Sequence, residues 1–182
     1  MIETEFNIGN LNLAALDNQG SGSVVIGLHG YLDNAESLRL LAPYLQTHRF
    51  VAIDLAGHGR SGHRTAGAHY NQADYLQDLY ALIESQGWDE VILLGHSLGG
   101  ILASLFAALF PEKVSAVISI DACGPLTEDE DTTVAQMRDA ILSRHAKSRN
   151  KLRVVELEDA VKARCKISDI SEAHARSILF RN

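Results

Sequence analysis

The stretch of sequence that decides the fold is Val91-Ile92-Leu93-Leu94-Gly95-His96-Ser97-Leu98-Gly99-Gly100. Four apolar residues open it, which is typical of a buried strand, and the apolar spacing that follows predicts a helix that stops before Pro111. Between strand and helix, the pattern GxSxG predicts a tight turn that holds Ser97 in a strained backbone conformation. Gly95 and Gly99 would leave room where a side chain would collide with the neighbouring strand or helix. The turn would place the Ser97 hydroxyl above the edge of a sheet.

Two backbone amides are expected beside Ser97. The Leu98 amide lies at the N-terminus of the predicted helix, where the helix dipole favours negative charge, and it would point toward an oxyanion formed there. His29-Gly30-Tyr31 follows another apolar run, so the Tyr31 amide is the candidate second donor. We expect His29 itself to be structural. The alternative for the whole motif is an incidental glycine-rich turn between a strand and a helix.

Short apolar runs elsewhere predict the rest of the sheet. They are nearly unbroken, which suits parallel strands that are covered on both faces. The runs are Val24–Leu28, Phe50–Ile53 and Val114–Ile120. Helix-like stretches at 37–45 and 71–85 alternate with them, and alternating residues on both sides of Gly9-Asn10 predict an antiparallel hairpin. This order predicts the α/β class, with a mostly parallel sheet and helices on both faces.

The pattern changes after Ile120. From Glu128 onward only helical periodicity is found, including the pair Val154-Val155. The sequence therefore predicts a core at residues 1–125 and a helical cap or lid segment at residues 126–182.

Composition and charge exclude several classes of function. The 182 residues are 46% apolar and 21% charged, which is the profile of a compact globular domain. The net charge is −7, and residues 1–125 carry 5 Lys and Arg against 13 Asp and Glu, so we expect no nucleic-acid partner. No apolar run approaches the roughly 18 residues of a membrane span, and the start has no signal-peptide pattern, so the sequence predicts a cytoplasmic protein.

Metal and cofactor chemistry is not expected from the sequence. The two cysteines, Cys123 and Cys165, are too few for a disulfide framework and lack the CxxC spacing of a metal or redox site. The turn around Ser97 lacks the phosphate-binding GxGxxG pattern, and no cluster of His, Cys and carboxylates has metal-ligand spacing. We therefore expect no cofactor and no metal.

Four segments together resemble the α/β-hydrolase fold, and especially its serine-hydrolase-like branch. They are HGYLDN at 29–34, DLAGHGRS at 54–61, GHSLGG at 95–100 and FPEKV at 110–114. The resemblance implies that Ser97 is the nucleophile, that Tyr31 and Leu98 carry the oxyanion-hole amides, and that the helical segment is a lid over an acyl pocket. We expect the segment DLAGHGRS at 54–61 to be a tight loop held by polar contacts rather than a reactive centre. Serine at position 97 disfavours the dehalogenase and epoxide-hydrolase routes, which use a carboxylate nucleophile.

The general base is the open question in this sequence. Members of the family continue beyond the cap with strands that carry the acid and then the histidine base, and no histidine of this chain occupies that position. A serine hydroxyl without a base is a poor nucleophile. We expect His96 to pack structurally, whereas His145 or His174 could reach the site from the lid. Asp121 is the candidate acid, although an aspartate that caps the following loop is the interpretation we favour.

Three functional hypotheses remain. In the preferred one, the chain is the N-terminal portion of a longer serine hydrolase that acts on ester or related acyl substrates. In the second, it is a catalytically silent protein of the same fold that binds a small ligand, and in the third it is one half of a split hydrolase. Without further strands, Val114–Ile120 would leave an unpaired sheet edge, so we expect self-association or binding of a C-terminal segment through this strand.

Overall fold

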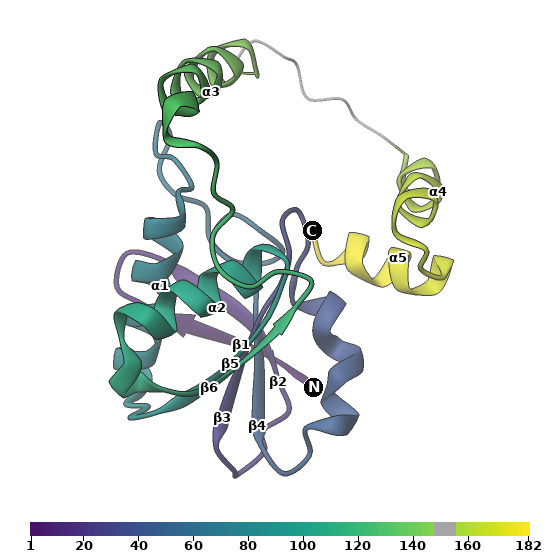
Figure 1. Ribbon diagram of the computed structural model, residues 1–182. Helices are drawn as coiled ribbons and strands as arrows, with labels where there is room; N and C mark the ends of the chain where they lie inside the picture. The colour runs from purple at the N-terminus through teal and green to yellow at the C-terminus, as the bar shows by residue number, and fades with distance from the viewer. Residues whose placement is uncertain (148–155) are drawn as a thin grey trace.

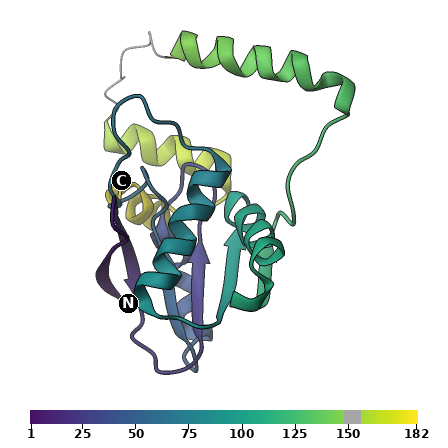
Figure 2. The ribbon, with the colours of Figure 1, turned by 90° about the vertical axis from the view of Figure 1, so that its left-hand side faces the viewer.

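The computed structural model describes residues 1–147 and 156–182, and it is built around one six-stranded sheet (Figures 1 and 2). The strands are β1 (Ile2–Asn7), β2 (Asn12–Asp17), β3 (Val24–Leu28), β4 (Arg49–Ile53), β5 (Val91–His96) and β6 (Val114–Ile120). Their order across the sheet is β1-β2-β4-β3-β5-β6. β1 and β2 form the expected antiparallel hairpin, β2 is antiparallel to β4, and the other three pairs are parallel. The predicted α/β class with a mostly parallel sheet is confirmed.

Helices cover both faces of this sheet. Those that follow the strands are η1 (Ala35–Tyr44), α1 (Gln72–Gln86), α2 (Leu98–Leu109) and the short η2 (Pro111–Lys113). Leu82 of α1 and Phe106 of α2 pack with Leu93 of β5 on one face. Leu38 of η1 packs with Leu94 of β5 on the other face. Neighbouring strand residues point to opposite sides, so β5 is buried on both faces, as its unbroken apolar run predicts.

The stretch predicted to be helical at 37–45 is a 3-10 helix that begins earlier, at Ala35. Its start is fixed by Asn34, whose side-chain oxygen accepts a hydrogen bond from the Glu36 N–H at 3.1 Å. Pro43 lies inside the helix and has no N–H to donate, which limits regular α-helical hydrogen bonding in its last turn.

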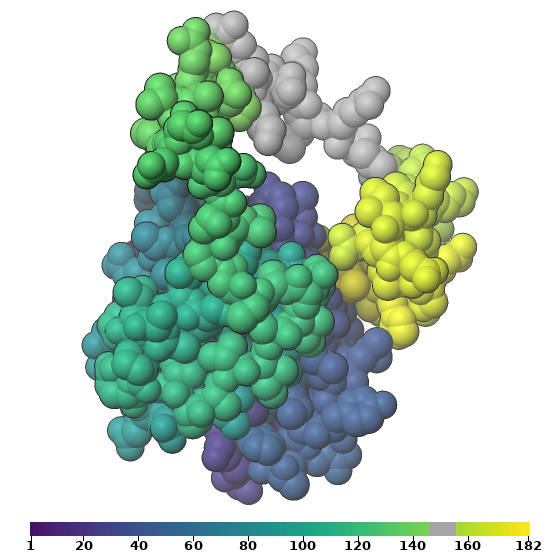
Figure 3. Space-filling view, viewed as in Figure 1, coloured from purple at the N-terminus to yellow at the C-terminus, as the bar shows by residue number. Residues whose placement is uncertain are grey.

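From Glu130 onward, the described residues form helices, as predicted. The helices are η3 (Glu130–Thr132), α3 (Thr133–Lys147), α4 (Leu157–Ser168) and α5 (Glu172–Phe180). α3 projects away from the sheet in both ribbon views, whereas α4 and α5 pack on each other and α5 contacts η1 (Figures 1 to 3). Val154 and Val155, which belong to the predicted helical pattern, lie outside the described residues. No helix in the described part of the chain is long and apolar enough to cross a lipid bilayer.

β6 is the edge strand of the sheet. It pairs with β5 on one side, and within residues 1–147 and 156–182 no strand pairs with its other side. Three of its apolar side chains, Val117, Ile118 and Ile120, are 37%, 43% and 39% exposed. The strand predicted to be apolar is therefore a partly exposed edge rather than a strand buried on both faces.

Candidate active site

Ser97 lies on a strained turn between β5 and α2, as the sequence predicts. Its backbone has φ 50° and ψ −114°, a conformation that costs a non-glycine residue free energy. The Ser97 N–H donates to the carbonyl oxygen of Ile120 at 2.9 Å, which ties the turn to the end of β6. The Ser97 carbonyl oxygen accepts hydrogen bonds from Gly100 and Ile101 at 2.9 and 3.1 Å. Hydrogen bonds on both sides thus hold the serine in place.

Close backbone contacts explain the glycines of this turn. A Cβ atom on Gly95 would collide with the backbone of Gly99 and Gly100. A Cβ atom on Gly99 would collide with the carbonyl oxygen of Leu28 in β3. Because backbone atoms of a packed helix or a central strand cannot move aside at low cost, only glycine fits at both positions.

The loop that carries Tyr31 lies directly against the Ser97 turn. A Cβ atom placed on Gly30 would lie 3.5 Å from Ser97 Cβ and 3.0 Å from His96 Nδ1. The loop is closed by a hydrogen bond from the Asp33 N–H to the Gly30 carbonyl oxygen at 3.2 Å. The structure therefore brings together the two segments that sequence reasoning linked through an oxyanion hole.

Tyr31 and Leu98 line the same cavity, which has a volume of about 760 Å³. Among the hydrogen bonds of the described residues, neither the Tyr31 N–H nor the Leu98 N–H donates to a protein group. Such amides at the mouth of a cavity can donate to the oxygen of a bound substrate. The arrangement can stabilise negative charge on that oxygen.

Four aromatic side chains also line this cavity, and no local signal in the sequence singled them out as site residues. They are His58, His63, Tyr70 and Tyr75. His58 belongs to the 54–61 loop, which follows β4, and the parallel arrangement of β3, β4 and β5 puts this loop at the same sheet edge as Ser97. The glycines Gly57 and Gly59 of that loop also line the cavity.

His29 is structural, as expected. It is fully buried, its Nδ1 donates to the Gly30 carbonyl oxygen at 2.8 Å, and its Nε2 accepts from the Leu55 N–H at 3.0 Å. Burial lowers the pKa of His29 from 6.5 to about 3, so the ring stays neutral near pH 7. Both ring nitrogens are engaged, which leaves neither free to take a proton from Ser97.

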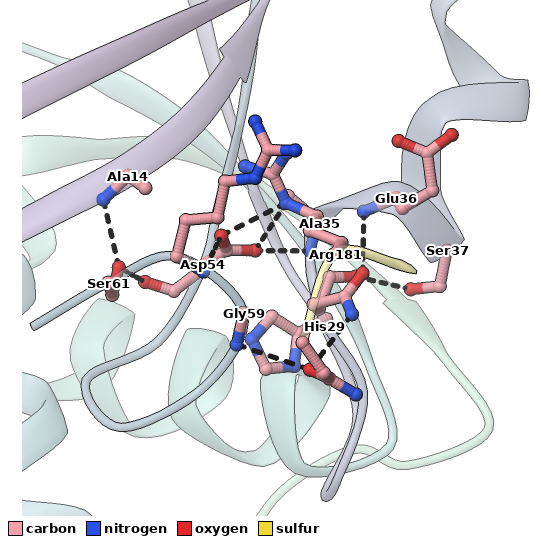
Figure 4. Close-up of polar contacts among 12 residues, drawn as sticks. Ala14, His29, Ala35, Glu36, Ser37, Asp54, Gly59, Ser61 and Arg181 are labelled. Carbon is pink, nitrogen blue, oxygen red and sulfur yellow. Dashed lines mark hydrogen bonds and ion pairs between the residues drawn. The ribbon is translucent and has the colours of Figure 1, made fainter. Parts of the chain in front are cut away.

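The 54–61 loop is held by polar contacts, as predicted. Figure 4 shows Asp54 at the centre of this network. Its carboxylate accepts hydrogen bonds from the N–H groups of Ala35 and Arg60 at 2.7 and 2.9 Å, and from Nε of Arg181. The Ser61 hydroxyl donates to the Asp54 carbonyl oxygen at 2.6 Å. The loop, η1 and the end of α5 therefore share one buried carboxylate.

The remaining candidates for base and acid are placed apart from the cavity described above. His96 and His174 line a second cavity of about 640 Å³ between η1 and the α4–α5 pair. His145 is exposed on α3. Within the described residues, no hydrogen bond joins a histidine to the Ser97 hydroxyl. Asp121 is exposed at the end of β6, with φ 69°, and its role stays a prediction.

A metal centre is not formed by the described residues. Among residues 1–147 and 156–182, no three His, Cys, Asp or Glu side chains are grouped so that they could hold a metal ion. The chemistry that this site can support is that of a serine hydroxyl beside two backbone N–H donors.

Comparison with known proteins adds the family. The model of the alpha/beta hydrolase fold family matches residues 23–152. A serine hydrolase-like protein of Danio rerio is 36% identical over 167 residues, which are 88% of this chain and 51% of the relative. A serine hydrolase-like protein of Homo sapiens is 36% identical over 111 residues, 60% of this chain and 55% of the relative. The chain spans about half the length of these two curated relatives.

Solved structures show the same likeness. The crystal structure of a hypothetical protein of Pseudomonas aeruginosa PAO1 matches all of this chain and 65% of its own, with 38% identity and a TM-score of 0.91. A thioesterase domain from the curacin biosynthetic pathway matches all of this chain and 67% of its own, with 27% identity and a TM-score of 0.82. On sequence, fold and site geometry, this chain belongs to the α/β-hydrolase family, in its serine-hydrolase-like branch.

Proposed function

We propose that this chain carries the nucleophile and the oxyanion hole of a serine hydrolase that acts on ester or related acyl substrates. The observation that carries the proposal is the strained backbone of Ser97, at φ 50° and ψ −114°, on the turn between β5 and α2. Strain of this kind costs on the order of 1–3 kcal/mol and is concentrated at functional sites. The adjacent Gly30-Tyr31 segment supports the same assignment, because it brings a second amide beside the serine.

In the proposed reaction, Ser97 Oγ attacks the carbonyl carbon of the substrate while the hydroxyl proton passes to a general base. The carbonyl oxygen becomes an oxyanion and accepts hydrogen bonds from the N–H groups of Tyr31 and Leu98. The tetrahedral intermediate then breaks its bond to the leaving alcohol, which takes the proton from the base. Water attacks the resulting acyl-Ser97 ester and releases the acid.

We assign the general base to a histidine beyond the described residues. His29 is fully engaged, and within the described residues the Ser97 hydroxyl has no histidine partner. The greater length of the solved Pseudomonas protein, of which this chain covers 65%, supports a larger complete site. For Asp121, capping of the following loop stays the favoured interpretation, and an acid that acts on that histidine is the alternative.

Labelling with a fluorophosphonate probe tests the assignment of Ser97. We expect the probe to label Ser97 in a version extended to the length of the family's members, and to label the 182-residue chain at least about a hundredfold more slowly, because the base is missing. Peptide mapping should place the label on Ser97. Ser97→Ala should abolish labelling, whereas the control Ser104→Ala should not, since the Ser104 hydroxyl donates to the Gly100 carbonyl oxygen within α2.

Three alternatives give different results in the same experiment. Fast, stoichiometric labelling of the 182-residue chain that is lost in His145→Ala or His174→Ala would place the base on the lid. Failure of the extended version to label would support a catalytically silent protein that binds a small ligand, a hypothesis that the 760 Å³ cavity also fits. Labelling restored by a separate, co-purifying chain would support a split hydrolase.

A further inference from the structure

The cavity beside Ser97 has a wall of aromatic rings. The ring centroids of Tyr70 and Tyr75 are 6.2 Å apart with an interplanar angle of 33°, and those of Tyr75 and His58 are 6.3 Å apart at 55°. Tyr70 lies directly over Gly57, because a Cβ atom there would come within 2.6 Å of the Tyr70 ring. Aromatic rings at such distances favour a further ring that stacks or meets them edge to face.

The side chains that line this cavity are apolar or uncharged polar groups, apart from two histidines. Within the described residues, no Lys, Arg, Asp or Glu side chain lines it. The second cavity differs, because Asp33, Glu36, Arg39 and Arg164 line it. A charged ligand in the first cavity would lose hydration without gaining an ionic partner, so an uncharged group is favoured there.

One side-chain hydroxyl that lines the first cavity, that of Tyr75, has no protein partner among the described residues. Tyr75 is 6% exposed, and among the hydrogen bonds of the described residues none involves its hydroxyl. The neighbouring Tyr70 differs, since its hydroxyl accepts from the Arg64 N–H at 2.9 Å. Burial raises the pKa of Tyr75 to about 12, so its O–H group stays a hydrogen-bond donor near neutral pH. A hydroxyl that lines a cavity and has no protein partner can donate a hydrogen bond to an acceptor atom of a ligand bound there.

We propose that this cavity binds an uncharged aromatic group that carries a hydrogen-bond acceptor, with the ring against Tyr70 and Tyr75 and the acceptor at the Tyr75 hydroxyl. This rests on the proposed function in one respect: the bound group becomes part of the substrate only if Ser97 is the nucleophile. Tyr31 and Leu98 line the same cavity, so the carbonyl to be attacked would lie next to the ring. The substrate class is then an aryl ester or a related aromatic acyl compound.

Binding of two matched amides tests the proposal without any catalytic step. Benzamide and cyclohexanecarboxamide share the carboxamide and nearly the same size, but only benzamide has an aromatic ring. Titration of the isotope-labelled chain, followed by backbone amide shifts, gives both dissociation constants and shows which residues respond. We expect benzamide to bind roughly threefold to tenfold more tightly, with shifts centred on Tyr31, Tyr70 and Leu98.

Variants separate the contribution of the aromatic rings to benzamide binding from that of the Tyr75 hydroxyl. Tyr75→Phe keeps the ring and should weaken benzamide by about threefold to tenfold through the lost hydrogen bond. Tyr70→Leu should remove most of the preference for benzamide, and the spectrum of each variant reports whether the fold is kept. His174→Ala, in the second cavity, is the matched control and should change neither constant. Equal affinity for the two amides, or shifts centred on the second cavity, would overturn the proposal.

Ser97→Ala distinguishes this proposal from the assignment of the nucleophile. The variant should bind benzamide as the parent chain does, because the amide is not attacked. Selective benzamide binding without fluorophosphonate labelling of the extended chain would keep the aromatic site and overturn the hydrolase. Labelling of the extended chain without any preference for benzamide would keep the hydrolase and overturn the aromatic site.

Discussion

Arg181 and Asp54 form a buried ion pair that joins the end of α5 to the end of β4. The Arg181 Nε donates to both Asp54 carboxylate oxygens, at 2.9 and 3.0 Å, and the two side chains are almost completely buried. Nη1 of the same arginine donates to Glu3 at 2.6 Å. These contacts hold α5 on the core. The segment expected to be a lid therefore contains α5, which is anchored to the core. It also contains α3, which projects away from the sheet (Figure 1).

The first prediction concerns this ion pair. Arg181→Met leaves the Asp54 carboxylate buried with an unpaired charge, so the free energy of unfolding should fall by about 3–5 kcal/mol. Urea unfolding followed by circular dichroism measures the change. Arg176→Met is the matched control: it breaks the exposed pair between α5 and Glu158 and should leave the stability nearly unchanged. Equal small effects for both variants would mean that α5 is not anchored through Asp54.

The second prediction concerns the pH dependence of stability. The folded-state pKa of His29 is about 3, against 6.5 for the unfolded chain. Below pH 6.5 the unfolded chain therefore binds a proton that the folded chain does not, and the free energy of unfolding falls as the pH falls. From pH 7.5 to pH 5.5, this one group should remove about 1.4 kcal/mol.

The variant His29→Gln isolates that contribution. Glutamine can still accept the Leu55 N–H through its amide oxygen, but it does not titrate. Urea unfolding at both pH values should show a smaller loss of stability in the variant than in the parent chain, although the variant is less stable at pH 7.5. The same loss in both chains would show that His29 does not stay neutral in the fold.

The strand, turn and helix around Ser97 could be predicted because each leaves a local signal in the sequence. An unbroken apolar run marks β5, and helical spacing up to Leu109 marks α2. The glycines at 95 and 99 mark a backbone that leaves no room for a Cβ atom. Each of these features depends on residues that are neighbours in the chain, so a short stretch of sequence is enough to predict it.

The aromatic wall and the Arg181–Asp54 pair could not be predicted in this way. Tyr75 has the position of a core residue in an amphipathic helix, and only the strand order β4-β3-β5 brings α1 and the 54–61 loop to the same cavity as Leu98, the residue after Ser97. Arg181 and Asp54 are 127 residues apart. Long-range contacts of this kind are decided by topology, and no local period announces them.

The third prediction compares two glycines beside Ser97. Gly99→Ala places a methyl group against the backbone carbonyl of Leu28, so it should cost about 3 kcal/mol or more and lower the yield of folded protein. Gly30→Ala meets the His96 ring and Ser97 Cβ, which are side-chain atoms, so the fold should remain. The added methyl group displaces the Tyr31 loop from Ser97, so fluorophosphonate labelling of the extended version should slow. Unchanged labelling in a folded Gly30→Ala protein would contradict the placement of the oxyanion hole.

The last prediction concerns the edge of the sheet at β6. We propose that a second copy of this chain, or a further C-terminal segment, pairs with this strand. One side of β6 has no partner strand within the described residues, and Val117 and Ile118 are partly exposed on opposite faces. The strand has no proline and no charged residue, the two features with which natural edge strands resist association.

Light scattering across a micromolar concentration series should therefore show that the mean mass of the 182-residue chain rises with concentration. Val117→Lys should reduce that rise, because a lysine on the edge must be desolvated when another strand approaches. Val134→Lys is the matched control, since Val134 is 80% exposed on α3 and away from the sheet edge. A reduction by both variants would point to general solubility rather than to the edge. A monomer at all concentrations, unchanged by Val117→Lys, would mean that β6 does not bind a second copy of this chain. In that case the proposal would stand only if an added C-terminal segment paired with β6.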